Sequence, residues 1–132
     1  MRAIEILTGV LLAHGALACG YCVEDKIAAA YDHAVVVSAL DRRHEVAFLS
    51  MEGGPPKGQE RAIAGAVESV AGVDRGTVRV SIEDGAVSFA FDPARAPESS
   101  IVGSVRKKLA AKGARTSLLK VLDDKIGASA RL

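Results

Sequence analysis

Two cysteines separated by two residues, in the run Cys19-Gly20-Tyr21-Cys22, are the only thiols of the chain. Two thiolates at this spacing can hold one soft metal ion, and Cu(I) is satisfied by two or three sulfur ligands. Zn(II) normally takes four protein ligands in a structural site, so it is the weaker candidate. The pair also precedes a predicted helix, whose free N–H groups and dipole favour thiolates. The sequence therefore predicts a copper(I) site formed by Cys19 and Cys22.

The same motif has two other interpretations. A C-x-x-C motif before a helix is also typical of thiol-disulfide redox proteins, and it can form a structural disulfide in a non-catalytic interaction domain. The histidines do not complete the metal site, because His33 would lie about 16 Å from Cys22 along a continuous helix and His44 would have to fold back. The sequence contains no phosphate loop, paired-carboxylate motif or haem-attachment motif. We therefore expect a protein that is not an enzyme.

The first eighteen residues have the layout of a secretory signal peptide. Arg2 is followed by an apolar stretch over residues 6–13 and by the small residues of Ala16-Leu17-Ala18, which is the pattern of a cleavable leader. Cleavage before Cys19 would give a periplasmic or secreted protein, and the alternative is an uncleaved helix or strand in a cytoplasmic protein. Membrane attachment is expected only if Cys19 carries a lipid.

The composition limits the remaining classes of function. The chain has 132 residues, the length of one domain, and 49% of them are hydrophobic. Its 17 basic and 16 acidic residues leave a net charge of +1, so no general electrostatic field attracts a nucleic acid. The chain has no tryptophan and only 4% aromatic residues, which argues against the stacking platforms of single-strand binders. We expect a metal ion as the ligand, and as partner a protein that transports or accepts the metal.

The elements that must position the cysteines begin with a helix predicted from Val23 to Leu40. Its apolar positions recur at steps of three and four, and they are Val23, Ile27, Ala30, Tyr31, Ala34 and Val35. A β-favouring run then covers Glu45 to Leu49, and apolar residues at helical spacing return from Gln59 to Gly72.

The second half of the chain repeats the alternation of strand and helix. Residues Thr77 to Ile82 and Ala86 to Phe91 alternate between apolar and polar or small side chains, and Glu83-Asp84-Gly85 is expected to form the hairpin turn between them. A third helix follows from Pro97 and ends near Gly113. The last strand is predicted from Thr116 to Leu122.

This order predicts a ferredoxin-like βαββαβ domain over residues 44–123, of the α+β class, with a four-stranded antiparallel sheet. Residues 1–18 are the predicted signal peptide, residues 19–43 carry the cysteine motif and the additional N-terminal helix, and residues 124–132 form a tail. The small residues Ala86, Ser88 and Ala90 leave room on the second face of the sheet. We expect the N-terminal helix to pack there through Ile27, Tyr31 and Val35.

The stretch from Glu60 to Gly113 resembles the heavy-metal-associated family, which includes copper chaperones and the metal-binding modules of P-type ATPases. The resemblance rests on the residues Val67-Glu68-Ser69-Val70-Ala71-Gly72-Val73, Gly85 to Phe91 followed by Asp92-Pro93-Ala94, and Ile101 to Leu109 leading to Lys112-Gly113. It implies the same fold and a role in metal handling. The family's loop reads M-x-C-x-x-C, whereas this chain keeps Met51 and has Gly53 and Pro56 at the cysteine positions. The usual metal loop is therefore degenerate, and Met51 is expected to support packing.

Overall fold

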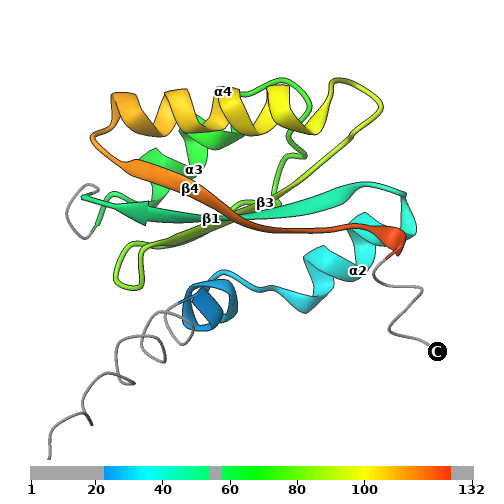
Figure 1. Cartoon of the computed structure of the whole chain (residues 1–132), viewed down its shortest axis with the longest axis horizontal. Coiled ribbons are helices and arrows are strands. Elements are labelled where there is room, and N and C mark those ends of the chain that lie inside the picture. Colours follow the sequence, from blue (N-terminus) through cyan, green and yellow to red (C-terminus); the bar gives the residue numbers. More distant parts are fainter. Residues whose placement is uncertain (1–22, 54–57, 126–132) are drawn as a thin grey trace, which may run out of the picture.

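The computed structural model describes residues 23–53 and 58–125 and shows one antiparallel sheet with strand order β2-β3-β1-β4. The strands are β1 (Glu45–Glu52), β2 (Arg79–Ser81), β3 (Ala86–Phe91) and β4 (Arg115–Leu122), and the labelled helices are α2 (His33–Asp41), α3 (Glu60–Glu68) and α4 (Glu98–Ala111). Helices α3 and α4 lie on one face of the sheet, while α2 and the helical residues 23–29 lie on the other (Figure 1). This arrangement is the predicted ferredoxin-like α+β fold with an additional N-terminal layer.

The larger core lies between the sheet and helices α3 and α4. Alternate residues of each strand point to one face of a sheet, and on β3 these residues are Val87, Phe89 and Phe91, all fully buried. They meet helix side chains such as Ile63 and Leu109, which are also fully buried. The apolar face of α4 packs here as well, because Ile101, Val102, Val105 and Leu109 all belong to this core.

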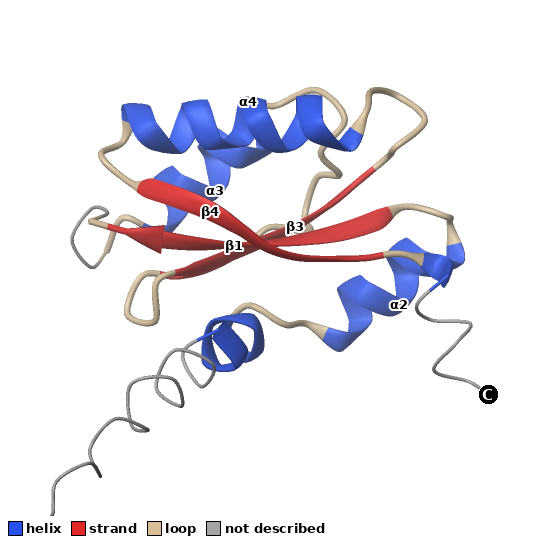
Figure 2. Cartoon of the chain, viewed as in Figure 1, coloured by secondary structure: helices blue, strands red, loops and turns tan. Residues whose placement is uncertain are grey.

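A second, smaller core lies on the opposite face of the sheet, as Figure 2 shows in the separation of α2 from α3 and α4. Ala86 and Ala90 of β3 and Phe48 of β1 face Ala39 of α2, and each of these side chains is at most 1% exposed. The hydroxyl of Ser88 donates a hydrogen bond of 2.6 Å to the carbonyl of Ala30. The expected packing of the N-terminal layer on small residues is therefore confirmed.

The N-terminal layer is not the single helix that the periodicity predicts. Residues 23–29 are helical, the helix stops at Ala30, and α2 begins at His33. The side chain of Asp32 caps α2 by accepting hydrogen bonds from the N–H groups of Ala34 and Val35, which satisfies donors that a helix start leaves unpaired. No helix in the described ranges is long and apolar enough to cross a membrane.

The break also changes the environment of Tyr31, which the sequence places in the apolar stripe. Its side chain is 44% exposed and stacks on Phe48 with ring centroids 6.4 Å apart. Its hydroxyl lies 3.2 Å from Nδ1 of His33, which is itself exposed. Tyr31 therefore covers the rim of the smaller core, and the prediction that it is a core residue is wrong.

Strand β2 is shorter than the alternation predicts. At Thr77 the side-chain hydroxyl, and not the backbone of a β2–β3 pair, makes the hydrogen bond to β3. The N–H of Ala90 donates to Oγ1 of Thr77 at 3.0 Å, and this hydroxyl donates to the carbonyl of Asp74 at 2.7 Å. The connection to β3 is also longer than an Asp-Gly pair, since it covers residues 82–85, and only Gly85 among them has a positive φ. The expected inward face is still present, with Val78 buried and Val80 and Ile82 partly buried against the larger core.

Candidate metal centre

Cys19 and Cys22, the predicted ligands, lie outside the described residues, and so do Pro55 and Pro56 of the degenerate loop. The described chain begins at Val23, which directly follows Cys22 and is 40% exposed. The helix that begins at Val23 is the described element nearest to the cysteines in the chain.

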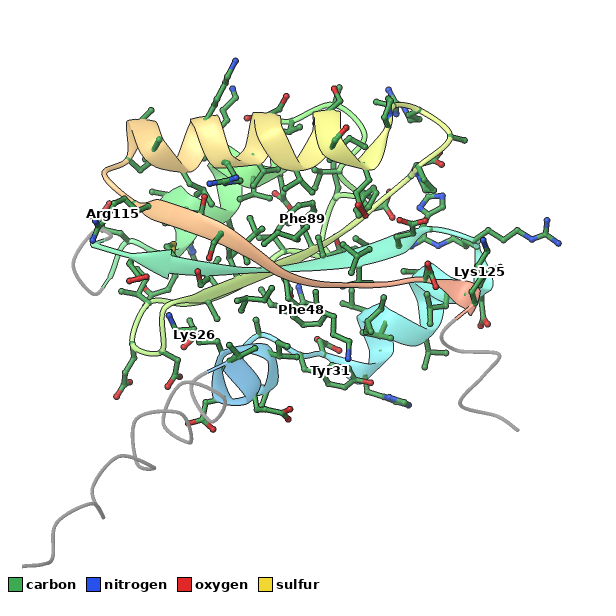
Figure 3. All side chains as sticks on the ribbon, in the orientation of Figure 1. Lys26, Tyr31, Phe48, Phe89, Arg115 and Lys125 are labelled. Carbon is green, nitrogen blue, oxygen red and sulfur yellow. The ribbon has the colours of Figure 1, made fainter. Side chains whose placement is uncertain are left out.

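The helix that contains Val23 lies against the end of the sheet where β1 stops. An ideal Cβ built at Gly85, in the β2–β3 connection, would lie 3.6 Å from Nζ of Lys26 and 2.6 Å from the carbonyl oxygen of Met51. The N–H of Met51 donates to the carbonyl of Gly85 at 2.8 Å. Figure 3 shows Lys26 and Arg115, the first residue of β4, at this same end of the molecule. The helix start, the hairpin and the end of β1 thus meet within a small region.

Met51, the residue that this chain shares with the family's loop motif, lies at this end as well and packs in the core. Met51 is 5% exposed and belongs to the larger core with Leu49 and Val87, so its side chain is used for packing. Glu52 and Gly53, which follow it, are exposed, and Gly53 has φ +64°. The structural role expected for Met51 is therefore confirmed.

A polar cluster that the sequence did not indicate occupies the opposite end of β1. Nδ1 of His44 lies 2.7 Å from Asp74, its Nε2 lies 3.8 Å from Asp92, and Arg42 reaches Asp74 at 3.4 Å. His44 therefore joins the start of β1 to the loop after α3. In residues 23–53 and 58–125 no group of three or more His, Cys, Asp or Glu side chains could hold a metal ion.

A second ion pair fixes the start of α2 to the sheet. Nε of Arg79 donates to Oδ2 of Asp32 at 2.9 Å, and the Nη1 atom of Arg79 also donates to the carbonyls of Gly76 and Val78. The hydrogen bond from Arg79 lowers the pKa of the Asp32 carboxyl below its usual value, and the Val35 N–H adds to this effect. Arg79 of β2 thus favours the charged form of the Asp32 carboxylate that caps α2.

Comparison with known proteins gives similarity to solved structures alone. No family model matches the chain, and no curated protein matches it. Oxidized MerP from Ralstonia metallidurans CH34 is 24% identical, covers 57% of this chain and 96% of its own, and superposes with a TM-score of 0.47. A copper binding domain from HMA7, a P-type ATPase, is 17% identical over 58% and 96% of the two chains, with a TM-score of 0.48. The N-terminal domain of a potential copper-translocating P-type ATPase from Bacillus subtilis, in the Cu(I)-loaded state, is 19% identical over 61% and 92%, with a TM-score of 0.49.

Proposed function

We propose that this protein binds a soft metal ion, Cu(I) in the first place, between the thiolates of Cys19 and Cys22, and passes it to a protein that transports or accepts the metal. The observation that carries the proposal is the spacing of the only two thiols, which lets both bind one ion. Copper(I) fits better than zinc, because two thiolates satisfy Cu(I), whereas a structural zinc site would need two further protein ligands.

The fold supports this proposal through the position of the residue after Cys22. Val23 starts the described part of a helix that contacts the β2–β3 connection through Lys26, next to the end of β1. The degenerate loop begins at the same end, directly after Met51 and Glu52. The proposed thiol pair directly precedes Val23 in the chain. The positive charge of Lys26, four residues after Cys22, would favour the thiolate form.

Replacing either cysteine by serine is expected to abolish tight Cu(I) binding. A single remaining thiolate loses the chelate, so the affinity should fall by about 100-fold or more. The measurement is a competition titration of the reduced protein against a chromogenic Cu(I) chelator. Neither variant should change the melting temperature much, because both cores formed by the described residues keep all their side chains.

Met51→Ala is the matched control for this titration. The substitution should destabilise the protein by about 2 to 5 kcal/mol, because it empties a buried position, and the Cu(I) affinity should stay unchanged while the protein is folded. If both cysteine variants kept the affinity of the unchanged protein, the thiol pair would not be the site. Loss of affinity in Met51→Ala below its melting temperature would instead assign the metal to the loop.

We also infer that the mature protein begins at Cys19 and acts in the periplasm or outside the cell. Removal of residues 1–18 would leave every described element in place, because the described chain starts at Val23. An N-terminal cysteine would then offer its α-amino group as a further metal ligand. Mass spectrometry of the protein from its native host should show a chain starting at Cys19, and an intact Met1 would contradict secretion.

A further inference from the structure

The outer flank of β4 and α4 has opposite charges at its two ends. At the start of β4 an open groove of about 610 Å³ runs between this strand and the C-terminal half of α4. The groove is lined by three cationic residues, four small or polar residues and no acidic residue, namely Arg106, Lys107, Arg115, Gly103, Ala110, Ala114 and Thr116. In the described part of the chain, the side chains of Lys107 and Arg115 form no ion pair within 4 Å. This local positive charge contrasts with a net charge of only +1 for the whole chain.

Arg106 fixes the shape of the basic groove. Its Nε lies 3.2 Å from Oγ1 of Thr116, and its Nη2 donates to the carbonyl of Thr116 at 2.8 Å. The guanidinium thus bridges α4 and β4 and occupies one backbone acceptor at the edge of the sheet. A partner on this flank must therefore be recognised mainly by its side chains and not by a continuous strand ladder.

The other end of the same flank is acidic. Glu45 begins β1, Glu98 begins α4, and Asp124 follows the end of β4. Partial burial raises the pKa of the Glu45 carboxyl, the negative charges of Glu98, Asp123 and Asp124 raise it further, and the positive charge of Lys125 lowers it. Because α4 starts and β4 stops at this end, four carboxylates and one cation, Lys125, lie at the far end of β4 from Arg115, and negative charge predominates there. Figure 3 shows Arg115 at one end of β4 and Lys125, the residue after Asp124, near the other end.

Between the two charged ends lies an exposed aliphatic side chain, Leu118. It is 43% exposed, and its partner across the ladder is Leu49, which faces the larger core. Leu118 therefore stands on the α4 side of the sheet, at the outer edge. The flank therefore has an exposed leucine at its middle, a basic end and an acidic end. When a second copy is rotated by 180°, its acidic end faces the basic end of the first, so the surface is complementary to itself.

We propose that a second copy of this chain packs on this flank in antiparallel orientation, so that the basic groove of each copy receives the acidic end of the other. A two-fold axis near the middle of β4 brings Leu118 of both copies to the centre and places Asp124 beside the partner copy's Arg115. It also sets the start of each α4, with Glu98, against the C-terminal half of the other, with Lys107. Every favourable contact then occurs twice, and the antiparallel helix dipoles attract one another. The contact uses residues 98–124 and does not depend on the proposed metal site.

The experiment is analytical ultracentrifugation of the Cys19→Ser/Cys22→Ser protein over a range of concentrations, with a metal chelator and reductant present. This background excludes dimers bridged by a metal ion or a disulfide. The protein should sediment at twice the mass of one chain, and the dimer should dissociate more readily at high salt. Arg115→Glu and Asp124→Lys should each weaken the dimer by about 10-fold or more, because each places like charges together twice.

The double variant Arg115→Glu/Asp124→Lys decides the outcome, since it restores the charge pair with reversed signs. It should recover most of the dimer, whereas Arg75→Glu, at an exposed loop position outside the flank, should behave like the unsubstituted protein. A chain that stays monomeric at all concentrations would overturn the proposal, even if an acidic peptide bound the groove. A double variant no better than its single parents would also overturn it.

Discussion

Replacing Phe89 by alanine is expected to lower the free energy of unfolding by about 3 to 5 kcal/mol, because it empties the centre of the larger core. Phe89 is fully buried in the middle of β3, opposite Ala47 of β1. Its ring is tilted against that of Phe91 with centroids 6.0 Å apart. Both neighbouring strands and α4 surround the site, so the cavity left by the substitution cannot collapse without moving several elements. A loss of this size is a large fraction of the stability of a domain this small.

Denaturant unfolding monitored by circular dichroism measures this effect. Val37→Ala is a suitable control, since Val37 lies on α2 with its side chain 42% exposed and should change stability by about 0.5 kcal/mol or less. An unfolding free energy for Phe89→Ala within 1 kcal/mol of the unsubstituted protein would mean that β3 does not pack against α3 and α4 as described.

Gly85→Ala is expected to destabilise the protein more than Gly76→Ala, although both glycines have a positive φ. A left-handed backbone costs an alanine about 1 to 2 kcal/mol at either position. At Gly76 an added Cβ would meet nothing within 4 Å, whereas at Gly85 it would lie 2.6 Å from the carbonyl oxygen of Met51. That oxygen belongs to the backbone, so the hairpin or the end of β1 must move. The pair of variants separates the cost of the close contact from the cost of the φ angle.

Thermal melts of both variants measure the difference, and the amide signals of Met51 and Lys26 should shift in Gly85→Ala alone. Equal destabilisation by the two substitutions would show that the hairpin does not touch the end of β1.

The sheet and its crossovers could be predicted because their signals are local. Strict alternation identified Val78, Val80 and Ile82 and then Val87, Phe89 and Phe91 as one inward face, and the structure places all six in or against the larger core. The small residues Ala86, Ser88 and Ala90 also indicated correctly where the N-terminal layer packs.

The break in that layer could not be predicted because its causes are distant in sequence. Periodicity continues through Ala30 to Asp32, but the Ala30 carbonyl accepts from Ser88, and Asp32 pairs with Arg79, 47 residues later. Only the capping preference of aspartate could have suggested a helix start there. The helical spacing of the apolar residues was stronger evidence for one helix than the capping preference of Asp32 was for a break. The tertiary contacts of Ala30 and Asp32 nevertheless divide the layer.

The candidate site was less predictable than the fold. The cysteine spacing identifies possible ligands, but no local pattern relates Lys26 to Gly85 and Met51, which the fold brings together. The cluster of His44 with Asp74 and Asp92 was missed for the same reason, since the two aspartates lie 30 and 48 residues after His44 in sequence. The role of Cys19 and Cys22 remains a prediction from their spacing.

The two cores differ in the size of their buried side chains, and this difference determines which part of the domain unfolds first. Large side chains such as Phe89, Ile101 and Leu109 fill one side of the sheet, whereas the other side is closed mainly by alanine and valine around Phe48. Little apolar area holds residues 23–41 in place, so this layer can separate as its own cooperative unit while the sheet and its two crossover helices stay folded. The cysteine pair precedes that unit in the chain. Under the proposed function, the ease with which a bound ion reaches an acceptor would then be set by a partial unfolding equilibrium and not by the stability of the whole protein.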